Sequence, residues 1–524
     1  DMRIPLSIVL AVMLPVATGT VLVVSASPAA ASCVSHVPSD FNGDNHSDVA
    51  IGAILHNEDA FTKSGAVQVT YGSSSGLQTA GSQLFDETDF PSLSPGSDDQ
   101  FGESMMTGNF NGDCYADLAL TIPGFETPDA RGPATTAKDI GGGIAILFGS
   151  AGGLTTIGDQ LFAANGLDAT VTPQDMALAA GDFNKDGRTD LAIGFPQGDG
   201  GDGSVAILKG TAAGLTNAGL LLLTQDTPNV PGTAENGDAF GSALAAADFT
   251  GDGYADLAIG AFGEDYGSVV NAGSVTILKG SSSGLTGTGS KSWTEDSSGV
   301  PGTGESIDEW GETLAAGDIT GDGKADLAIG APGEGVGSAG FAGAVTILHG
   351  SSSSILTTSG AQGFSQDSSG IPGTAESGDL FSQSLAVGDL NGDGHADLAI
   401  GDPDERVGSL GDAGTVTVLY GRSSGLTTSG AKAWDQDSPG ITGGTEANDR
   451  FGTSLIALPV RSSSRADLII GDSGESLGTL DRCGAVALIP GSSGGLTATG
   501  NQLIDPATVA GGAQALGEFG WSVG

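Results

Sequence analysis

The chain contains few basic residues for its size. Lys and Arg together number 17 against 63 Asp and Glu, which gives a formal net charge of −46 at pH 7. Because nucleic acids and anionic bilayers would repel such a polyanion, we exclude nucleic acid as a partner. Hydrophobic residues nevertheless make up 38% of the sequence, so the chain is not a disordered acidic tail.

Cysteine and histidine are also scarce. Three Cys in 524 residues exclude a disulfide framework, so at most one bridge can form. A bridge between Cys33 and Cys483 would tie the first unit of the chain to the last, and we expect this pairing rather than one that uses Cys114. The five His residues provide no cluster that could build a catalytic zinc site, since His46 and His395 fall at variable positions of repeated loops. The sequence therefore predicts no catalytic residues and no organic cofactor.

Long apolar runs are absent except near the start of the chain. Residues 4–24 are mostly apolar and precede Ala29-x-Ala31, which is the layout of a secretory signal peptide. An uncleaved anchor and lipidation at Cys33 are the alternatives. No other segment approaches the roughly 18 uninterrupted apolar residues of a membrane span. We therefore expect a signal peptide over residues 1–31 and a single secreted domain over residues 32–524, monomeric and without a transmembrane segment.

The chain is rich in one acidic loop, which occurs six times. The first copy runs from Asp40 to Asp48, and successive copies begin about 70 residues apart. Positions 1, 5 and 9 of a loop carry carboxylates and position 3 carries an Asn or Thr oxygen, which suits a hard cation such as Ca²⁺. Position 7 varies, as expected if only its backbone carbonyl faces the ion. The predicted calcium-binding residues are Asp40, Asn42, Asp44, His46, Asp48, Asn109, Asn111, Asp113, Tyr115, Asp117, Asp182, Asn184, Asp186, Arg188, Asp190, Asp248, Thr250, Asp252, Tyr254, Asp256, Asp318, Thr320, Asp322, Lys324, Asp326, Asp389, Asn391, Asp393, His395 and Asp397.

The alternative for these loops is a ladder of Asx turns, because Asp, Asn and Gly favour turns without any metal. Several carboxylates within a few ångströms would repel one another strongly unless a cation lay between them, and this favours calcium. The second loop begins with Asn109 and has one charge fewer, so we expect it to bind more weakly. The expected role of the ion is structural, since it would pin each loop.

Short β-type runs flank each loop. An aromatic residue and Gly head the run before it, as at Phe240-Gly241, and Asp-Leu-Ala-Ile-Gly follows it, as at Asp256 to Gly260. A third run follows, such as Gly343 to Gly350, and a fourth lies around Trp293 or its counterparts. Four strands per unit and no amphipathic helical segment predict an all-β repeat. A unit of about 70 residues suits a propeller blade with long loops better than a solenoid coil.

The number of units predicts how the ring closes. A seventh copy from Pro459 to Gly471 keeps the strand but loses the loop carboxylates, so we expect seven blades of four antiparallel strands. The C-terminal segment Phe519 to Val523 has the form of a first strand with no loop after it. We expect this strand to complete the blade that the first loop begins, which removes exposed sheet edges. In the alternative, residues 34–39 form a degenerate first strand.

These units resemble the FG-GAP repeats of the integrin α-subunit head, in which Phe-Gly and Gly-Ala-Pro flank a calcium loop. Here Phe240-Gly241 and Gly330-Ala331-Pro332 stand in those places, and the resemblance covers nearly all of the chain from about Cys33 onward. It implies a seven-bladed propeller with Ca²⁺ in the loops between the first and second strands of some blades. The sequence lacks the inserted adhesion domain, the leg domains and the membrane span of integrins, so an integrin heterodimer is not implied.

Two functions remain open at this stage. The first is an extracellular module that binds a protein or a glycan through the face opposite the calcium loops. The second is an extracellular hydrolase related to glycosylphosphatidylinositol phospholipase D, whose zinc-bearing catalytic portion has no counterpart here. Gly72 to Gly76 and Gly280 to Gly284 match a nucleophile elbow, but no helix follows them and we expect hairpin turns. A second recurring acidic set is expected to cap turns, with a ligand-facing ring as the alternative: Asp238, Asp308, Asp379 and Asp449.

Overall fold

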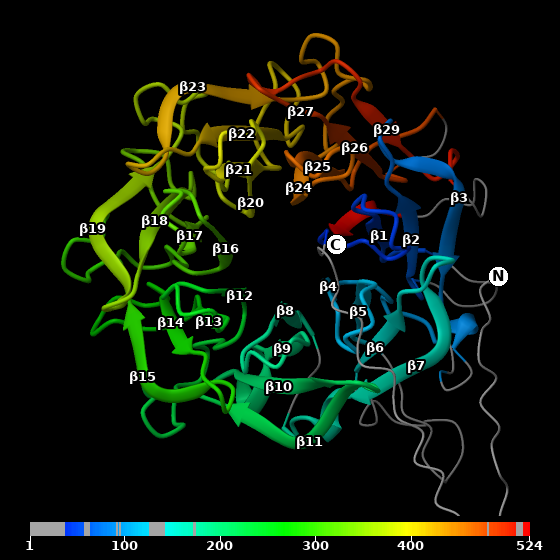
Figure 1. Cartoon of the computed structure of the whole chain (residues 1–524). Helices are drawn as coiled ribbons and strands as arrows, with labels where there is room; N and C mark the ends of the chain where they lie inside the picture. The colour runs from blue at the N-terminus through cyan, green and yellow to red at the C-terminus, as the bar shows by residue number, and fades with distance from the viewer. Residues whose placement is uncertain are drawn as a thin grey trace, which may run out of the picture.

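The computed structural model describes residues 37–56, 63–90, 93, 96–124, 142–170, 174–478, 482–509 and 517–524. The predicted signal peptide and Cys33 lie outside these ranges. Within them, the strands form seven four-stranded antiparallel sheets that Figure 1 shows arranged as blades around a central axis. The predicted all-β, seven-bladed propeller is therefore confirmed.

The first strand of each blade lies nearest the axis and the fourth lies at the rim (Figure 1). Blades 1 to 3 comprise β30 (Phe519–Val523), β1 (Val49–Ala53), β2 (Ala66–Tyr71) and β3 (Gln78–Phe85); β4 (Met105–Gly108), β5 (Asp117–Ile122), β6 (Gly143–Phe148) and β7 (Thr155–Ala163); and β8 (Ala177–Gly181), β9 (Asp190–Phe195), β10 (Ser204–Thr211) and β11 (Gly214–Leu223). Blades 4 and 5 comprise β12 (Leu244–Ala247), β13 (Asp256–Ala261), β14 (Ser274–Lys279) and β15 (Thr286–Trp293); and β16 (Thr313–Gly317), β17 (Asp326–Ala331), β18 (Ala344–Ser351) and β19 (Ile355–Phe364).

Blades 6 and 7 comprise β20 (Ser384–Gly388), β21 (Asp397–Asp402), β22 (Thr415–Tyr420) and β23 (Thr427–Trp434); and β24 (Phe451–Leu458), β25 (Asp467–Asp472), β26 (Ala485–Ile489) and β29 (Gln502–Ile504). A two-stranded ribbon of β27 (Gly491–Ser492) and β28 (Gly495–Leu496) accompanies blade 7. The helices of the described chain are single 3₁₀ turns: η1 (Glu87–Asp89), η2 (Ala164–Gly166) and η3 (Gly198–Gly200).

The second strand of every blade is buried along its whole length, because it is covered on both faces by neighbouring blades. This explains why Asp-Leu-Ala-Ile-Gly is a continuous apolar run rather than an alternating one. One apolar cluster fills each gap between adjacent blades, as between blades 4 and 5, where Ile277 and Trp310 meet Ile329. The last cluster packs Ile51 of blade 1 against Ile469 of blade 7.

Two repeated glycines allow the blades to approach closely. A Cβ on Gly260 in β13 would lie 2.1 Å from the carbonyl oxygen of Gly311 in the next blade. Gly311 itself has a φ of +97°, a backbone conformation that glycine adopts readily. The aromatic residue and the Gly or Ser after it precede the first strand as a turn in blades 2, 4, 5 and 6, where the sequence had suggested that they head the strand.

The C-terminal strand closes the ring, as the sequence predicted. β30 pairs with β1 so that Phe519 faces Ala53 and Val523 faces Ile51. Ala50 and Gly524 exchange backbone hydrogen bonds of 2.9 and 3.0 Å. Residues 37–39 form no strand, so within the described chain β30 alone supplies the first strand of blade 1.

Candidate functional site

The last carboxylate of each acidic loop is tied to the backbone of its own blade. In loop four, Oδ1 of Asp256 accepts the N–H of Gly280 at the end of β14, at 2.8 Å. In loop one, the two oxygens of Asp48 accept N–H groups from Phe41 and Gly72, each at 2.8 Å. These Asp side chains are buried because they begin the buried second strand. Position 9 thus joins the loop to the turn after the third strand.

The first carboxylate of each loop folds the loop around itself. Oδ1 of Asp248 accepts the N–H groups of Gly251 and Asp252 at 2.7 and 3.1 Å, and its Oδ2 accepts that of Gly253 at 2.7 Å. Asp252 in turn accepts the N–H of Tyr254 at 3.1 Å. In loop four these bonds join positions 1 and 5, and much of the loop geometry follows from Asx-type bonds.

The donor set of the loops fits a hard cation. Oδ2 of Asp256 is buried and has no hydrogen-bond partner. Burial raises the pKa of Asp256 to about 6, with the neighbouring Asp252 and Asp248 adding to the effect. Burial likewise raises the pKa of Asp117 to about 7 and that of Asp48 to about 8. A divalent ion among these carboxylates would compensate their burial and mutual repulsion.

The seven loops form a continuous ring of hydrogen bonds between blades, which the sequence did not predict. The residue at position 8 of each loop donates its N–H to the carbonyl at position 1 of the preceding loop. The bonds measure 2.8 to 3.3 Å and join Ala116 to Asp40, Thr189 to Asn109, Ala255 to Asp182, Ala325 to Asp248, Ala396 to Asp318, Ala466 to Asp389 and Ser47 to Pro459. Each loop therefore connects its blade to the next one.

Position 7 also contacts the neighbouring loop, although its residue type varies. The side chain of Tyr115 lies against Gly43, and that of Lys324 lies against Gly251. A Cβ added to either glycine would contact the side chain from the next loop. Nδ1 of His46 lies 2.8 Å from the carbonyl oxygen of Val460 in the seventh loop. The sequence suggested that residue type varies at position 7 because only the backbone carbonyl is used. The structure shows that the side chain at this position also packs against the neighbouring blade.

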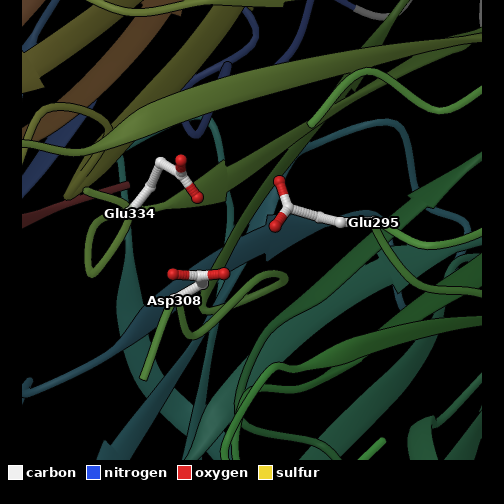
Figure 2. A group of neighbouring side chains, drawn as sticks. All are labelled: Glu295, Asp308 and Glu334. Carbon is white, nitrogen blue, oxygen red and sulfur yellow. The ribbon is translucent and has the colours of Figure 1, made fainter. Parts of the chain in front are cut away.

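The second acidic set caps turns, as expected. Oδ2 of Asp238 accepts the N–H of Glu235 at 2.8 Å, and Asp379 accepts that of Glu376 at 2.5 Å. Asp308 does the same but also lies beside two further carboxylates, as Figure 2 shows. These connections leave the strands at the ends opposite the acidic loops, because adjacent strands are antiparallel.

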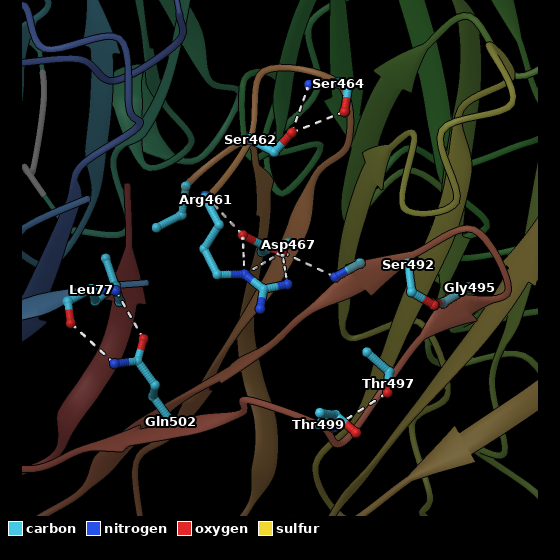
Figure 3. A network of polar contacts seen from close by, with 12 residues as sticks. Leu77, Arg461, Ser462, Ser464, Asp467, Ser492, Gly495, Thr497, Thr499 and Gln502 are labelled. Carbon is cyan, nitrogen blue, oxygen red and sulfur yellow. Dashed lines mark hydrogen bonds and ion pairs between the residues drawn. The ribbon is translucent and has the colours of Figure 1, made fainter. Parts of the chain in front are cut away.

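In the seventh loop an arginine takes the place of the missing charges. The guanidinium of Arg461 lies 2.9 Å from Oδ1 of Asp467 through Nη2 and 3.2 Å from both carboxylate oxygens through Nε (Figure 3). Arg461 occupies loop position 3 and Asp467 position 9. The sequence analysis missed this pair. The signal that could have revealed it was a basic residue, Arg461, in a loop without the other carboxylates. In the same view, the side chain of Gln502 bonds both backbone groups of Leu77 and so joins blade 7 to blade 1.

The predicted disulfide between Cys33 and Cys483 is wrong. Cys483 is a free thiol, buried between blades, and its Sγ lies 3.5 Å from the carbonyl oxygen of Glu475. Cys114 in the second loop is disulfide-bonded instead, and its partner lies outside the described residues. The spacing of the cysteines along the chain does not record which of them approach one another in space.

Exposed apolar side chains gather on the face opposite the acidic loops. Tyr266 and Val270, in the connection between β13 and β14, are 53% and 50% exposed. Ile307 and Phe341, in the next two connections of this face, are 42% and 48% exposed. The N–H of Ile307 donates to the carbonyl of Val270 at 2.9 Å, so these connections touch.

Comparison with known proteins identifies similar repeats. The FG-GAP repeat family matches residues 176–208, 240–278, 310–348 and 381–419, which cover strands of blades 3 to 6. Integrin alpha-V of Gallus gallus is 32% identical over 170 residues, which are 32% of this chain and 15% of that protein. Phosphatidylinositol-glycan-specific phospholipase D of Homo sapiens is 33% identical over 164 residues, which are 30% of this chain and 18% of that protein.

The solved structure of the exotype rhamnogalacturonan lyase YesX aligns with 89% of this chain and 71% of its own, at 11% identity and a TM-score of 0.34. The matches to the curated relatives span less than a fifth of those proteins' lengths. Among the described residues no helix has the length and apolarity to cross a membrane.

Proposed function

Because this chain belongs to the FG-GAP repeat proteins and has an integrin-α-like propeller, we propose that it is an extracellular module that binds a protein or a glycan. The proposed binding surface is the face formed by the connections between second and third strands and between consecutive blades. Its centre lies over blades 4 and 5. The proposal includes secretion, Ca²⁺ in the six acidic loops, and a monomeric chain.

The observation that carries this proposal is the set of exposed apolar side chains on these connections, Tyr266, Val270, Ile307 and Phe341, which we call the apolar patch. Exposed apolar groups lower the solubility of a protein. Patches of them on an otherwise polar surface mark binding surfaces in other proteins. The connections that hold these residues are linked to one another through backbone groups, as from the N–H of Ile307 to the carbonyl of Val270, so these links do not depend on which side chains they carry. They can therefore vary in sequence without weakening the ring.

Calcium has a structural role in this proposal. The ion would be held by the carboxylates at positions 1, 5 and 9 and the oxygen at position 3, and it would supply positive charge within each loop. The ion would thereby hold the residue at position 1 in place. The backbone carbonyl of this residue accepts the N–H of the next loop. Loss of the ion would loosen the links between blades rather than remove a catalytic group.

The binding proposal is tested with labelled protein on arrays of extracellular glycans and of secreted and cell-surface proteins. A variant with Tyr266→Ser, Val270→Ser and Phe341→Ser should lose at least tenfold in affinity for any ligand that the wild type binds. Ile157→Ser is the matched control, because Ile157 is 85% exposed on β7 of blade 2, away from this patch. A loss of affinity in the triple variant no larger than that in Ile157→Ser would place ligand recognition elsewhere on the protein.

An extracellular hydrolase is the second candidate, because part of the chain is similar to proteins named phosphatidylinositol-glycan-specific phospholipase D. Purified protein would be assayed on a panel of phosphodiester, ester and glycoside substrates with and without Ca²⁺. Turnover that survives substitution of the apolar patch would favour this candidate over the binding module.

A further inference from the structure

A group of three carboxylates lies between blades 4 and 5, away from the six acidic loops. Glu295 follows β15, Asp308 precedes β16 and Glu334 follows β17. Each offers one carboxylate oxygen, and the three oxygens lie within 4.8 Å of one another. Figure 2 shows the three carboxylates directed toward a common point.

Two of these side chains are almost completely buried, and the group contains carboxylate oxygens that accept no hydrogen bond. Glu295 is 5% exposed and Asp308 is 2% exposed. Oε2 of Glu295 and Oε2 of Glu334 have no hydrogen-bond partner, while Oδ2 of Asp308 accepts the N–H of Glu305 at 2.5 Å. Buried carboxylates this close repel one another unless a cation lies between them or a proton is shared.

Comparison between blades shows what is unusual about Glu295. At three other junctions the same place holds a Gln whose amide donates to the Glu that corresponds to Glu334. These pairs are Gln225 with Glu264, Gln366 with Glu405 at 2.7 Å, and Gln436 with Glu475 at 2.6 Å. Between blades 4 and 5 the neutral donor is therefore replaced by a third carboxylate.

Acidic residues at two other blade junctions differ from the group of Glu295, Asp308 and Glu334. Glu446, Asp449 and Glu475 also come within 4.8 Å of one another, but Gln436 keeps its bond to Glu475 there. Glu87 takes the place of Glu295 between blades 1 and 2, where the residue corresponding to Glu334 in the sequence is Phe125. Of these two groups of three carboxylates among the described residues, only the one between blades 4 and 5 contains a buried member, Glu295, with an unpartnered oxygen of its own.

We propose that Glu295, Asp308 and Glu334 bind a hard divalent cation, of which Ca²⁺ fits best. Oxygens up to 4.8 Å apart can share one Ca²⁺, because each Ca–O bond measures about 2.3 to 2.6 Å. A cavity of about 350 Å³ adjoins the group, lined by Glu295, Glu334, Val336, Phe364 and Ser365. It gives an ion access and leaves room for the waters that complete its coordination. The ion would tie the end of blade 4 to blade 5 beside the apolar patch.

The test compares Glu295→Gln with the wild type. This substitution restores the Gln–Glu pair found at the other junctions, so the variant should fold. Protein freed of metal with a chelator is titrated with Ca²⁺ by calorimetry, and bound ions are counted after equilibrium dialysis. Glu295→Gln should bind one ion fewer per chain than the wild type. An unchanged count would overturn the proposal and indicate a shared proton.

A luminescent ion gives an independent measurement. Trp293 and Trp310 lie two residues from Glu295 and Asp308, so excitation of tryptophan should sensitise Tb³⁺ bound to this group. The emission should fall in Glu295→Gln and in Glu334→Gln, and Ca²⁺ should compete for it. Emission that is equal in all three proteins would overturn the proposal.

The acidic loop of the same blade supplies the matched control. Asp318→Asn removes a carboxylate from loop five and should leave the tryptophan-sensitised component intact. A normal ion count in Asp318→Asn with a reduced count in Glu295→Gln would refute calcium in that loop but support this second site. The reciprocal change, Gln366→Glu, creates the three-carboxylate arrangement at the next junction and should add one ion.

Discussion

Nη2 of Arg461 lies 2.9 Å from Oδ1 of Asp467, so the seventh blade holds a cation of its own where six other loops carry additional carboxylates. Asp467 has the same backbone bond as its counterparts, since it accepts the N–H of Gly491 at 3.0 Å. The buried Asp that begins each second strand thus has a structural task in all seven blades. What differs is that in the seventh loop a guanidinium lies against this carboxylate.

Arg461→Ala should destabilise the protein by about 3 kcal/mol, because it leaves the carboxylate of Asp467 buried without its partner. Urea unfolding monitored by tryptophan fluorescence measures the change. The double variant Arg461→Ala with Asp467→Asn should recover part of the loss. Equal stability of the wild type and the single variant would contradict this interpretation of the pair.

Removal of calcium should lower the melting temperature of the wild type. Six sites that bind only the folded state would each contribute about 2.7 kcal/mol at a Ca²⁺ concentration 100 times the dissociation constant. Differential scanning calorimetry with Ca²⁺ or with a chelator measures the difference, and Asp256→Asn should make it smaller. A melting temperature indifferent to chelator would leave the Asx-turn ladder as the explanation of the loops.

Loss of the C-terminal strand should open the ring. Phe519→Ala should cost about 3 to 5 kcal/mol because Phe519 is fully buried between blades 7 and 1. Deletion of residues 517–524 should cost more and should promote aggregation, since it exposes the edge of β1. Trp521→Ala is the control, because Trp521 is only partly buried. Light scattering on heating and chemical denaturation distinguish the three variants.

Asp472→Ala should stabilise the protein at neutral and alkaline pH. Asp472 is fully buried at the end of β25, both carboxylate oxygens lack partners, and burial together with Glu475 raises its pKa well above the usual 3.8. The folded state therefore retains a proton that the unfolded chain releases, so the wild type loses stability as pH rises above about 4, by at most about 1.4 kcal/mol per pH unit.

The corresponding residues of blades 4 and 5 are Ala261 and Ala331, which shows that alanine fits this position. Unfolding free energies of Asp472→Ala and the wild type should therefore converge near pH 4 and diverge toward pH 8. A constant difference across this range would indicate that Asp472 does not change its protonation on folding.

Gly260→Ala should destabilise the ring by about 1 to 3 kcal/mol, because its Cβ would lie 2.1 Å from the carbonyl oxygen of Gly311 and force blades 4 and 5 apart. Gly340→Ala is a matched control in a connection of blade 5, where an added Cβ meets nothing within 4 Å. Melting temperatures of the two variants give the comparison, and similar losses would argue against close approach as the role of Gly260.

The repeat made most of the fold predictable. Each unit contains the same buried Asp-Leu-Ala-Ile-Gly strand and the same turn residues, and the chain must bury both faces of that strand by stacking units. Phe519 to Val523 could be recognised as a first strand because it begins with the Phe-Gly pair that stands at the first strand of other blades. Hydrophobic patterning and turn chemistry act locally, and six or seven copies average out the errors that a single copy would give.

The sequence by itself determined the blade, the number of blades and the residues of the acidic loops, because local patterns specify strands and turns. Only the tertiary structure decided what meets across blade junctions. The hydrogen bond from Ala255 to Asp182 and the meeting of Glu295 with Glu334 both follow from the packing of adjacent blades in the ring. Residues about 40 or 70 positions apart come together there through the angle between blades, which no spacing along the chain records.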